Sequence, residues 1–347
     1  MSIKKLKKDV FNDLVAALID SDQRVVGVKA KGDRFAFGDL ESADELRLDY
    51  DVTLLPPKKF MLPQMETLLK YEVGGEYKSA GEAPKMTLIG VHPYDLVAIN
   101  QMDEIFAQDE YDKYYMNRRN NITIIACDVV TPSKNVFAGS MGTATVDKGY
   151  DVLLTDMGDS YLAEAATDKG EELLAKAAQA DDASPQDIEA RSKVWQENKE
   201  KLNKHKLNCE PGDIPKLLDK EEVYDHPVWE EKASMCYSCG SCTSVCPTCY
   251  CFDVQDDVEW NLKEGKRWRA WDGCVLENFA TVTGEHNFRK QRAQRFRHRI
   301  FRKGKYVPSK IGGQIACVGC GRCVTACTTD IANPVDIYNR LLEDVKI

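Results

Sequence analysis

Hydrophobic positions up to about residue 165 fall in short runs that are separated by stretches with helical spacing. Runs of β-branched residues bounded by turn-forming residues are typical of strands. Five segments fit this description: VVGVKA (25–30), RFAFGD (34–39), MTLIGV (86–91), NITIIACDVV (121–130) and DVLLTDM (151–157). The third of them leads through His92 and Pro93 into the helical pattern of residues 94–106. The chain is therefore expected to have an α+β fold that begins with an α/β-type domain.

Three further segments complete the N-terminal part. Residues 1–20 place charged residues between apolar positions at helical spacing, which predicts a first amphipathic helix and not a secretory signal. Residues 139–149 contain glycines but lack the spacing of a dinucleotide-binding fingerprint, so a loop is expected. From about residue 166 the chain is polar and helix-forming, and Ser184 followed by Pro185 is typical of a helix start.

The composition changes near residue 225, where a stretch rich in cysteine begins. We therefore expect two domains, an N-terminal α/β domain of residues 1–225 and a second domain of residues 226–347. The segment from about residue 166 serves as a helical linker in this division. A mean hydropathy of -0.44 and the lack of a long apolar run argue against a transmembrane helix and favour a cytoplasmic protein with no membrane partner.

Thirteen cysteines in a cytoplasmic chain favour metal binding over disulfides, and an odd number cannot pair completely. A single cysteine in a strand, such as Cys127, is expected to be a small buried hydrophobic residue. The stretch of residues 235–252 reads MCYSCGSCTSVCPTCYCF and is different, since it holds six cysteines. Such a concentration of thiols predicts a metal centre.

Two groups of cysteines have the spacing C-x2-C-x2-C-x3-C. The first run is Cys236, Cys239, Cys242 and Cys246, and the second is Cys317, Cys320, Cys323 and Cys327. This spacing is that of bacterial ferredoxins with [4Fe–4S] clusters, in which the fourth cysteine of each run binds the other cluster. We therefore expect one cluster on Cys236, Cys239, Cys242 and Cys327 and another on Cys317, Cys320, Cys323 and Cys246. Residues 226–347 would then be a helix-rich, ferredoxin-like dicluster domain with a long insert between the runs.

Three cysteines near these runs do not fit the two clusters. Cys249, Cys251 and Cys274 are additional thiols, and Cys209 could supply a fourth. They predict a possible third site, either iron–sulfur or zinc. The alternative is that they pack beside the clusters as buried thiols.

The formal net charge of -9 is unevenly distributed. Residues 226–347 hold 18 Lys and Arg against 14 Asp and Glu, so the remainder of the chain is strongly acidic. The stretch 286–305 holds nine Lys or Arg, with Ala293, Phe296 and Ile300 at helical spacing. Two four-thiolate clusters would contribute a charge of about -4. The basic helix is therefore expected to balance the clusters, the acidic half or an acidic partner surface, and not to bind nucleic acid.

The order of three C-terminal motifs carries a resemblance to a known family. CPTCYCFDV, RWRAWDGCVLENFATVTGEHNFR and CVGCGRC, together with IGVHPYDLVAI and SMGT upstream, resemble the iron–sulfur beta subunit of cytosolic sulfhydrogenases and the related iron–sulfur subunit of anaerobic sulfite reductase. This resemblance implies an electron-transfer protein, with no catalytic residues of its own, in a hetero-oligomeric complex. The partners it implies are a flavoprotein that carries FAD and oxidises NAD(P)H, and a catalytic redox subunit of the hydrogenase, sulfite reductase or heterodisulfide reductase type.

Two functions from other classes compete with this interpretation. A zinc-stabilised nucleic-acid-binding protein would use the cysteine runs and the basic helix, and would lose affinity steeply with salt. A sulfur or disulfide reductase would use the extra cysteines as a catalytic metal site. No constellation resembling a nucleophile triad or an acid–base pair stands out in the sequence, so the electron relay is the function that we expect.

Overall fold

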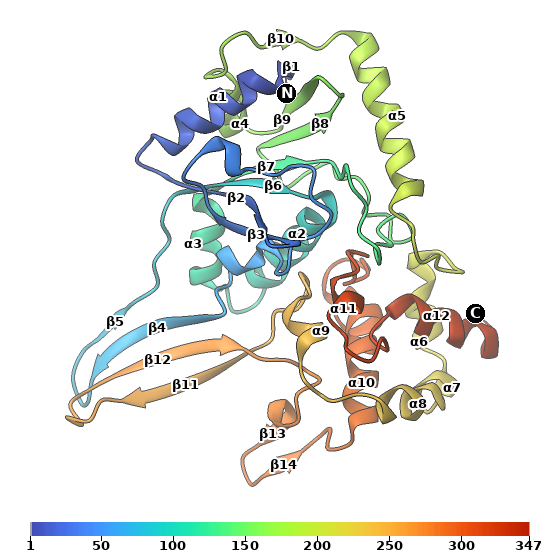
Figure 1. The fold of residues 1–347 in the computed structure, drawn as a ribbon. Helices are drawn as coiled ribbons and strands as arrows, with labels where there is room; N and C mark the ends of the chain where they lie inside the picture. The colour runs from blue at the N-terminus through green and yellow to red at the C-terminus, as the bar shows by residue number, and fades with distance from the viewer. Residues whose placement is uncertain (1, 347) are drawn as a thin grey trace.

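The computed structural model describes residues 2–346, and its N-terminal part is a mixed α/β domain, as expected (Figure 1). Its centre is an eight-stranded sheet. In sheet order the strands are β10 (Asp181–Asp182), β1 (Ile3–Lys7), β9 (Ser160–Ala165), β8 (Val152–Asp156), β7 (Ile122–Cys127), β6 (Met86–Val91), β2 (Arg24–Lys31) and β3 (Arg34–Asp39). The five strands predicted from hydrophobic runs are all present.

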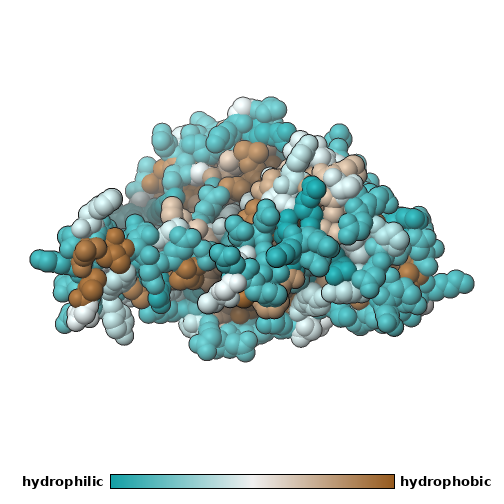
Figure 2. Space-filling view, turned by 90° about the horizontal axis from the view of Figure 1, so that it is seen from below, coloured by the Kyte–Doolittle hydropathy of each residue, from teal (hydrophilic) through white to brown (hydrophobic). Residues whose placement is uncertain are grey.

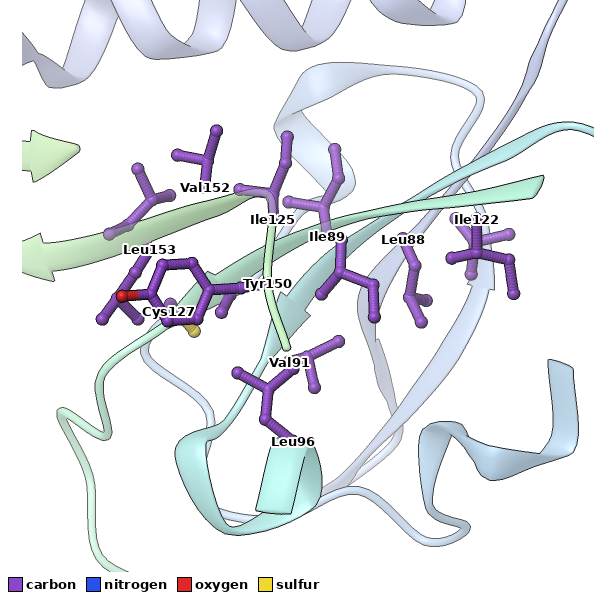
Figure 3. Packing of buried hydrophobic residues seen from close by; sticks show 14 of the residues in the cluster. Leu88, Ile89, Val91, Leu96, Ile122, Ile125, Cys127, Tyr150, Val152 and Leu153 are labelled. Atoms are coloured by element: carbon purple, nitrogen blue, oxygen red, sulfur yellow. The ribbon is translucent and has the colours of Figure 1, made fainter. Parts of the chain in front are cut away.

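The middle of this sheet is parallel. Strands β2, β6, β7 and β8 pair in parallel, and the outer strands pair antiparallel. Parallel strands are buried on both faces, which explains why their sequences are continuous apolar runs and do not alternate. Every residue of β6 is buried. Figure 3 shows side chains of β6, β7 and β8, Cys127 among them, packed in one hydrophobic core. Cys127 is thus a buried hydrophobic residue, as predicted.

The first residues of the chain correct one expectation. Residues 1–20 were expected to form a single helix, but Ile3–Lys7 form strand β1, and helix α1 spans only Lys8–Ile19. Strand β1 pairs antiparallel with β9, and Leu6 becomes fully buried. The helix therefore begins only at Lys8. The local spacing could not indicate the strand before it, because β9, the partner of β1, lies about 155 residues further along the chain.

Helices lie around the sheet and in the C-terminal part. They are α1, α2 (Pro93–Ala107), α3 (Lys113–Asn121), α4 (Asp168–Leu174), α5 (Pro185–Lys201), α6 (Ile214–Leu218), α7 (Glu221–Tyr224), α8 (Val228–Ser234), α9 (Ser241–Ser244), α10 (Arg292–Phe301), α11 (Arg322–Thr325) and α12 (Pro334–Asp344). A π-helical turn, η5 (Arg302–Tyr306), continues α10. Within residues 2–346, no helix combines the length and the apolar composition that a membrane crossing requires.

Helix α5 begins where the sequence predicted, immediately after Ser184. The Ser184 hydroxyl accepts a hydrogen bond from the Asp187 backbone N–H at 3.2 Å, and the Ser184 backbone N–H donates to the Asp187 carboxylate at 3.0 Å. This reciprocal capping box satisfies two N–H groups that have no partner inside the helix. In Figure 1, α5 descends from the sheet toward the C-terminal part, so its cap fixes the start of this connection.

We expect Ser184→Ala to destabilise the chain by about 1 kcal/mol, because the substitution removes this cap. The free energy of unfolding in urea measures the effect. Ser192→Ala is the matched control, since Ser192 lies inside the same helix and caps nothing. Equal losses in the two variants would contradict the capping argument.

A four-stranded antiparallel arm was not predicted from the sequence. It combines β4 (Met65–Glu72) and β5 (Tyr77–Ser79) of the N-terminal part with β11 (Phe252–Val258) and β12 (Glu264–Trp271), in the order β11-β12-β4-β5. The arm projects from the body at the lower left of Figure 1. Trp260 and Leu262 are exposed at its tip, and Figure 2 shows a hydrophobic patch at this outer end of the molecule.

Buried charges fasten the arm to the body. The Arg269 Nε donates to Glu66 at 2.7 Å, joining β12 to β4. Arg118 of α3 contacts the same carboxylate, and Arg269 also contacts Asp112, the residue that caps α3. Because the insert between the cysteine runs pairs with N-terminal strands, contacts cross the proposed division near residue 225. The domain boundary itself stays a prediction.

Candidate iron–sulfur site

The first cysteine run lies in a loop that twice adopts left-handed backbone. Ser238 has φ +56° and Gly240 has φ +78°, and α9 begins directly after Gly240. The Ser238 backbone N–H donates to the Cys236 sulfur at 3.4 Å. A loop whose amides point at its own cysteine sulfurs is the surrounding that tunes an iron–sulfur cluster.

The second run repeats this geometry on α11. Gly319 has φ +65° and Gly321 has φ +76°, and α11 starts at Arg322. A Cβ atom on Gly321 would lie 2.3 Å from the Asn135 carbonyl oxygen, so a larger residue would collide with backbone. The left-handed backbone and the close contact with the N-terminal domain both explain why glycine stands at position 321.

The predicted loop 139–149 and the residues just before it support the second run. The Phe137 backbone N–H donates to the Gly319 carbonyl at 2.7 Å, and the Thr143 hydroxyl donates to the Val318 carbonyl at 2.7 Å. The sequence correctly indicated a loop here, but nothing in it indicated which segment the loop would contact. The loop is therefore part of the framework of the site.

A buried ion pair also joins the second run to the N-terminal domain. The Arg322 guanidinium makes two hydrogen bonds to the Asp95 carboxylate, at 2.6 and 2.7 Å, and its Nε donates to the Thr53 carbonyl at 2.9 Å. Asp95 lies in the first turn of α2 and is fully buried. Sequence reasoning missed this pair, because its members are 227 residues apart.

The last cysteine of the first run lies among the cysteines of the second. Burial raises the pKa values of the Cys317, Cys320 and Cys323 thiols, and negative charge on Cys246 adds to the rise at each of them. The Cys246 sulfur lies 3.3 Å from the Thr248 hydroxyl, which donates to the carbonyl of Ala316, just before Cys317. Cys246 is therefore next to the second run in space, although about 70 residues separate them.

The two runs also approach each other at other positions. Cys236 of the first run and Cys317 and Cys327 of the second lie against one hydrophobic cluster, which is formed largely by α6, α8, α10 and α12. Burial raises the pKa of Cys242 to about 12, and the Cys323, Cys274 and Cys236 thiols contribute to this rise. The two runs thus lie beside each other, with Cys246 close to the second run.

The two groups of thiols differ in their access to solvent. Cys239 is exposed, and Tyr237 beside it is 74% exposed. Cys320 and Cys323 are buried. The first run therefore reaches the surface at Cys239, whereas Cys320 and Cys323 of the second run lie inside the protein.

Buried cations accompany the thiols. Lys303 is 5% exposed and donates to the Thr248 hydroxyl at 2.5 Å. Arg299 is 2% exposed, and its Nε has no hydrogen-bond partner. An isolated buried cation is costly unless a negative charge compensates it. Eight thiolates and buried unpaired cations together fit anionic [4Fe–4S] clusters, which can be held by the eight cysteines of the two runs.

The spare cysteines lie in two regions, with Cys209 apart from Cys249, Cys251 and Cys274. Cys251 is the strongest charged influence on Cys274, whose pKa is raised mainly by burial. Cys249 forms a hydrogen bond with Cys246 that lowers the pKa of Cys246. Cys209 instead lies against the hydrophobic cluster that Cys236 and Cys327 also contact. Within residues 2–346, no three His, Cys, Asp or Glu side chains are grouped closely enough for a single metal ion.

Comparison with known proteins agrees with this geometry. The family model described as a 4Fe-4S dicluster domain matches residues 235–331, which include both cysteine runs. Over 333 residues the chain is 34% identical to a protein of Pyrococcus furiosus named sulfhydrogenase 2 subunit beta. The match covers 95% of this chain and 96% of that protein. The similarity therefore includes the N-terminal domain and the arm as well as the cysteine runs.

Proposed function

The chain belongs to the family of sulfhydrogenase beta subunits, and from this we propose that it relays electrons between a flavoprotein that oxidises NAD(P)H and a catalytic redox subunit of the hydrogenase type. It is an iron–sulfur electron-transfer subunit of a sulfhydrogenase-type complex, as the resemblance in the sequence implied. The proposal includes two partners of this chain: the catalytic subunit, and the flavoprotein with its FAD and NAD(P).

The observation that carries the proposal is the position of Cys246, the last cysteine of the first run, beside the second run. Because Cys246 lies among the thiols of the second run, it supports the ligand set Cys317, Cys320, Cys323 and Cys246 for one cluster. Cys327 is then left as the fourth ligand for Cys236, Cys239 and Cys242 at the other cluster. Crossed sets of this kind occur in two-cluster ferredoxins.

Each cluster supplies a site that accepts and releases a single electron. The protein's contribution is to hold one such site at the surface, near Cys239, and the other in the interior. We infer that the exposed loop of the first run faces one redox partner. The ion pair of Arg322 with Asp95 keeps the second site fixed against the N-terminal domain. We propose that residues 226–347 form the dicluster domain and that residues 1–225 position it.

Iron and acid-labile sulfide per chain test the proposal directly. After purification without oxygen, we expect at least about eight of each and a brown protein, because each cubane carries about four. A colourless protein loaded with zinc would contradict the relay and favour the nucleic-acid-binding alternative. Reduction by the partner flavoprotein, followed by visible spectroscopy, would then test the direction of electron flow.

We further propose a third centre on Cys249, Cys251 and Cys274, of the iron–sulfur type and not zinc, because a cluster has ligands that lie further apart than those of a single ion. The proximity of Cys251 to Cys274 supports this pairing, whereas Cys209, the fourth residue in the sequence-based prediction, lies against a different part of the core. A third cubane would bring the iron count to about twelve, and a two-iron centre to about ten.

The double variant Cys251→Ser and Cys274→Ser tests the third centre. We expect it to keep about eight irons and to lose the metal above that number, because neither cysteine belongs to the two runs. Cys127→Ser is the control, since Cys127 is buried in β7. If wild type and double variant hold equal metal, these cysteines are packing thiols and the third centre is absent.

A further inference from the structure

Three cations follow one another along a single face of α10 and its π-helical continuation. Arg295, Arg299 and Lys303 are spaced four residues apart, and they are 3%, 2% and 5% exposed. Among the residues that the structure describes, none of the three forms an ion pair with a carboxylate. The sequence indicated a basic helix, but it could not indicate that these three positions turn inward.

Arg295 reaches the first cysteine run. Its Nη2 donates to the Ser238 hydroxyl at 3.2 Å, and Ser238 lies between Cys236 and Cys239. Its Nε donates to the carbonyl of Val275, the residue after Cys274, at 3.2 Å. The guanidinium is therefore held beside the loop of the first run by neutral oxygen atoms alone.

Lys303 reaches the second site at the other end of the row. Its ammonium donates to the Thr248 hydroxyl, which also contacts the Cys246 sulfur at 3.3 Å. Its backbone carbonyl accepts a hydrogen bond from the Ala316 N–H at 2.9 Å, one residue before Cys317. Lys303 thus lies between the two chain segments that would supply the second cluster.

Arg299 occupies the middle of the row, between Arg295 and Lys303. Its Nη1 donates to the Ala332 carbonyl at 3.4 Å, and the Cys323 thiol donates to the same carbonyl at 3.7 Å. The Cys242 and Cys323 sulfurs are the two thiols that interact most strongly with the charge of Arg299. Its Nε has no partner. One buried guanidinium therefore faces a cysteine of each proposed cluster.

We propose that each cation of this row stabilises the reduced form of a particular cluster. Arg295 acts on the first cluster, Lys303 on the second, and Arg299 on both. This inference rests on the proposed function. Reduction adds negative charge to a cluster, and a buried positive charge nearby stabilises that charge strongly because the local dielectric is low. The row therefore raises the reduction potentials of both clusters. It also keeps the two potentials similar, so that electrons can pass between the clusters in either direction.

The test compares three neutral variants of the full chain, Arg295→Met, Arg299→Met and Lys303→Met, in redox titrations followed by electron paramagnetic resonance. We expect Arg295→Met to lower the potential of the first cluster alone and Lys303→Met that of the second alone. Arg299→Met lowers both. The signals are assigned with Cys246→Ala and Cys327→Ala, which remove one cluster each under crossed ligation.

Two further variants separate charge from packing. Arg299→Lys keeps the charge, so both potentials stay near those of wild type. Arg297→Met is the matched control on the same helix, because Arg297 pairs with Asp225 and stacks on Tyr224 at the surface, and both potentials remain unchanged. Where Arg299→Met loads no clusters, recovery of wild-type signals in Arg299→Lys supports the inference, and their absence in both variants overturns it.

Other outcomes overturn the inference without touching the proposed function. Two normal clusters in wild type, with unchanged potentials in all three neutral variants, would mean that the row has no electrostatic effect on them. Equal shifts of both clusters in every variant would contradict the assignment of individual cations. A wild-type chain without iron would instead refute the proposed function itself.

Discussion

Cys246→Ala and Cys327→Ala each lose about four irons per chain, and they lose them from different clusters. The reason is that each removes the fourth ligand of a set whose other three members belong to the opposite run. Cys246 lies among Cys317, Cys320 and Cys323, which leaves Cys327 as the fourth ligand of the first cluster. Iron analysis gives the loss, and paramagnetic resonance of the reduced protein identifies the surviving signal.

The identity of the surviving signal decides the question. Cys239→Ala removes a member of the first run that is unaffected by the crossing, so its spectrum defines the loss of the first cluster. Crossed ligation requires Cys327→Ala to match that spectrum and Cys246→Ala to differ from it. If Cys246→Ala matches instead, each run binds its own cluster.

Asp95→Ala is expected to lower the free energy of unfolding by about 3–5 kcal/mol, because it leaves the buried Arg322 guanidinium without its carboxylate. Asp95 is fully buried and Arg322 is 3% exposed. The urea midpoint under anaerobic conditions measures the change. Since Arg322 follows Gly321 in the second run, we also expect this variant to retain less iron.

A surface pair serves as the control for this prediction. Arg47 and Asp49 form a comparable bidentate contact, at 2.8 and 2.7 Å, but both side chains are largely exposed. Asp49→Ala should therefore cost less than about 1 kcal/mol. The double variant Asp95→Ala and Arg322→Met should recover part of the loss, because it removes the unpaired charge. No recovery would show that the carboxylate acts by some means other than pairing with Arg322.

Local patterns made much of the fold and of the site predictable. The central strands are parallel and buried on both faces, so they appear as apolar runs that can be identified one at a time. The start at Ser184 depends on atoms within four residues. The two cysteine runs have a spacing tied to one kind of cofactor. Each of these features is encoded in a short stretch of chain.

Features that depend on distant partners could not be predicted. Strand β1 pairs with β9, and the strands of the arm are rich in polar residues, so only pairing with distant strands identifies them. The inward direction of Arg299 depends on the packing of Ala293, Phe296 and Ile300, whose apolar face was predicted, and on thiols that other segments supply. Residue type alone indicates a solvated basic helix here.

The arm combines strands from the N-terminal part with strands from the insert between the cysteine runs, so it can form only late in synthesis at the ribosome. Strand β4 leaves the ribosome nearly 200 residues before β12, its neighbour on one side. During that interval one edge of β4 is open, and Glu66 can pair with Arg118 but not yet with Arg269. The arm therefore closes only after the first cluster loop has been synthesised, and a chain that stops before residue 264 keeps an open edge on β4 that chaperones can recognise.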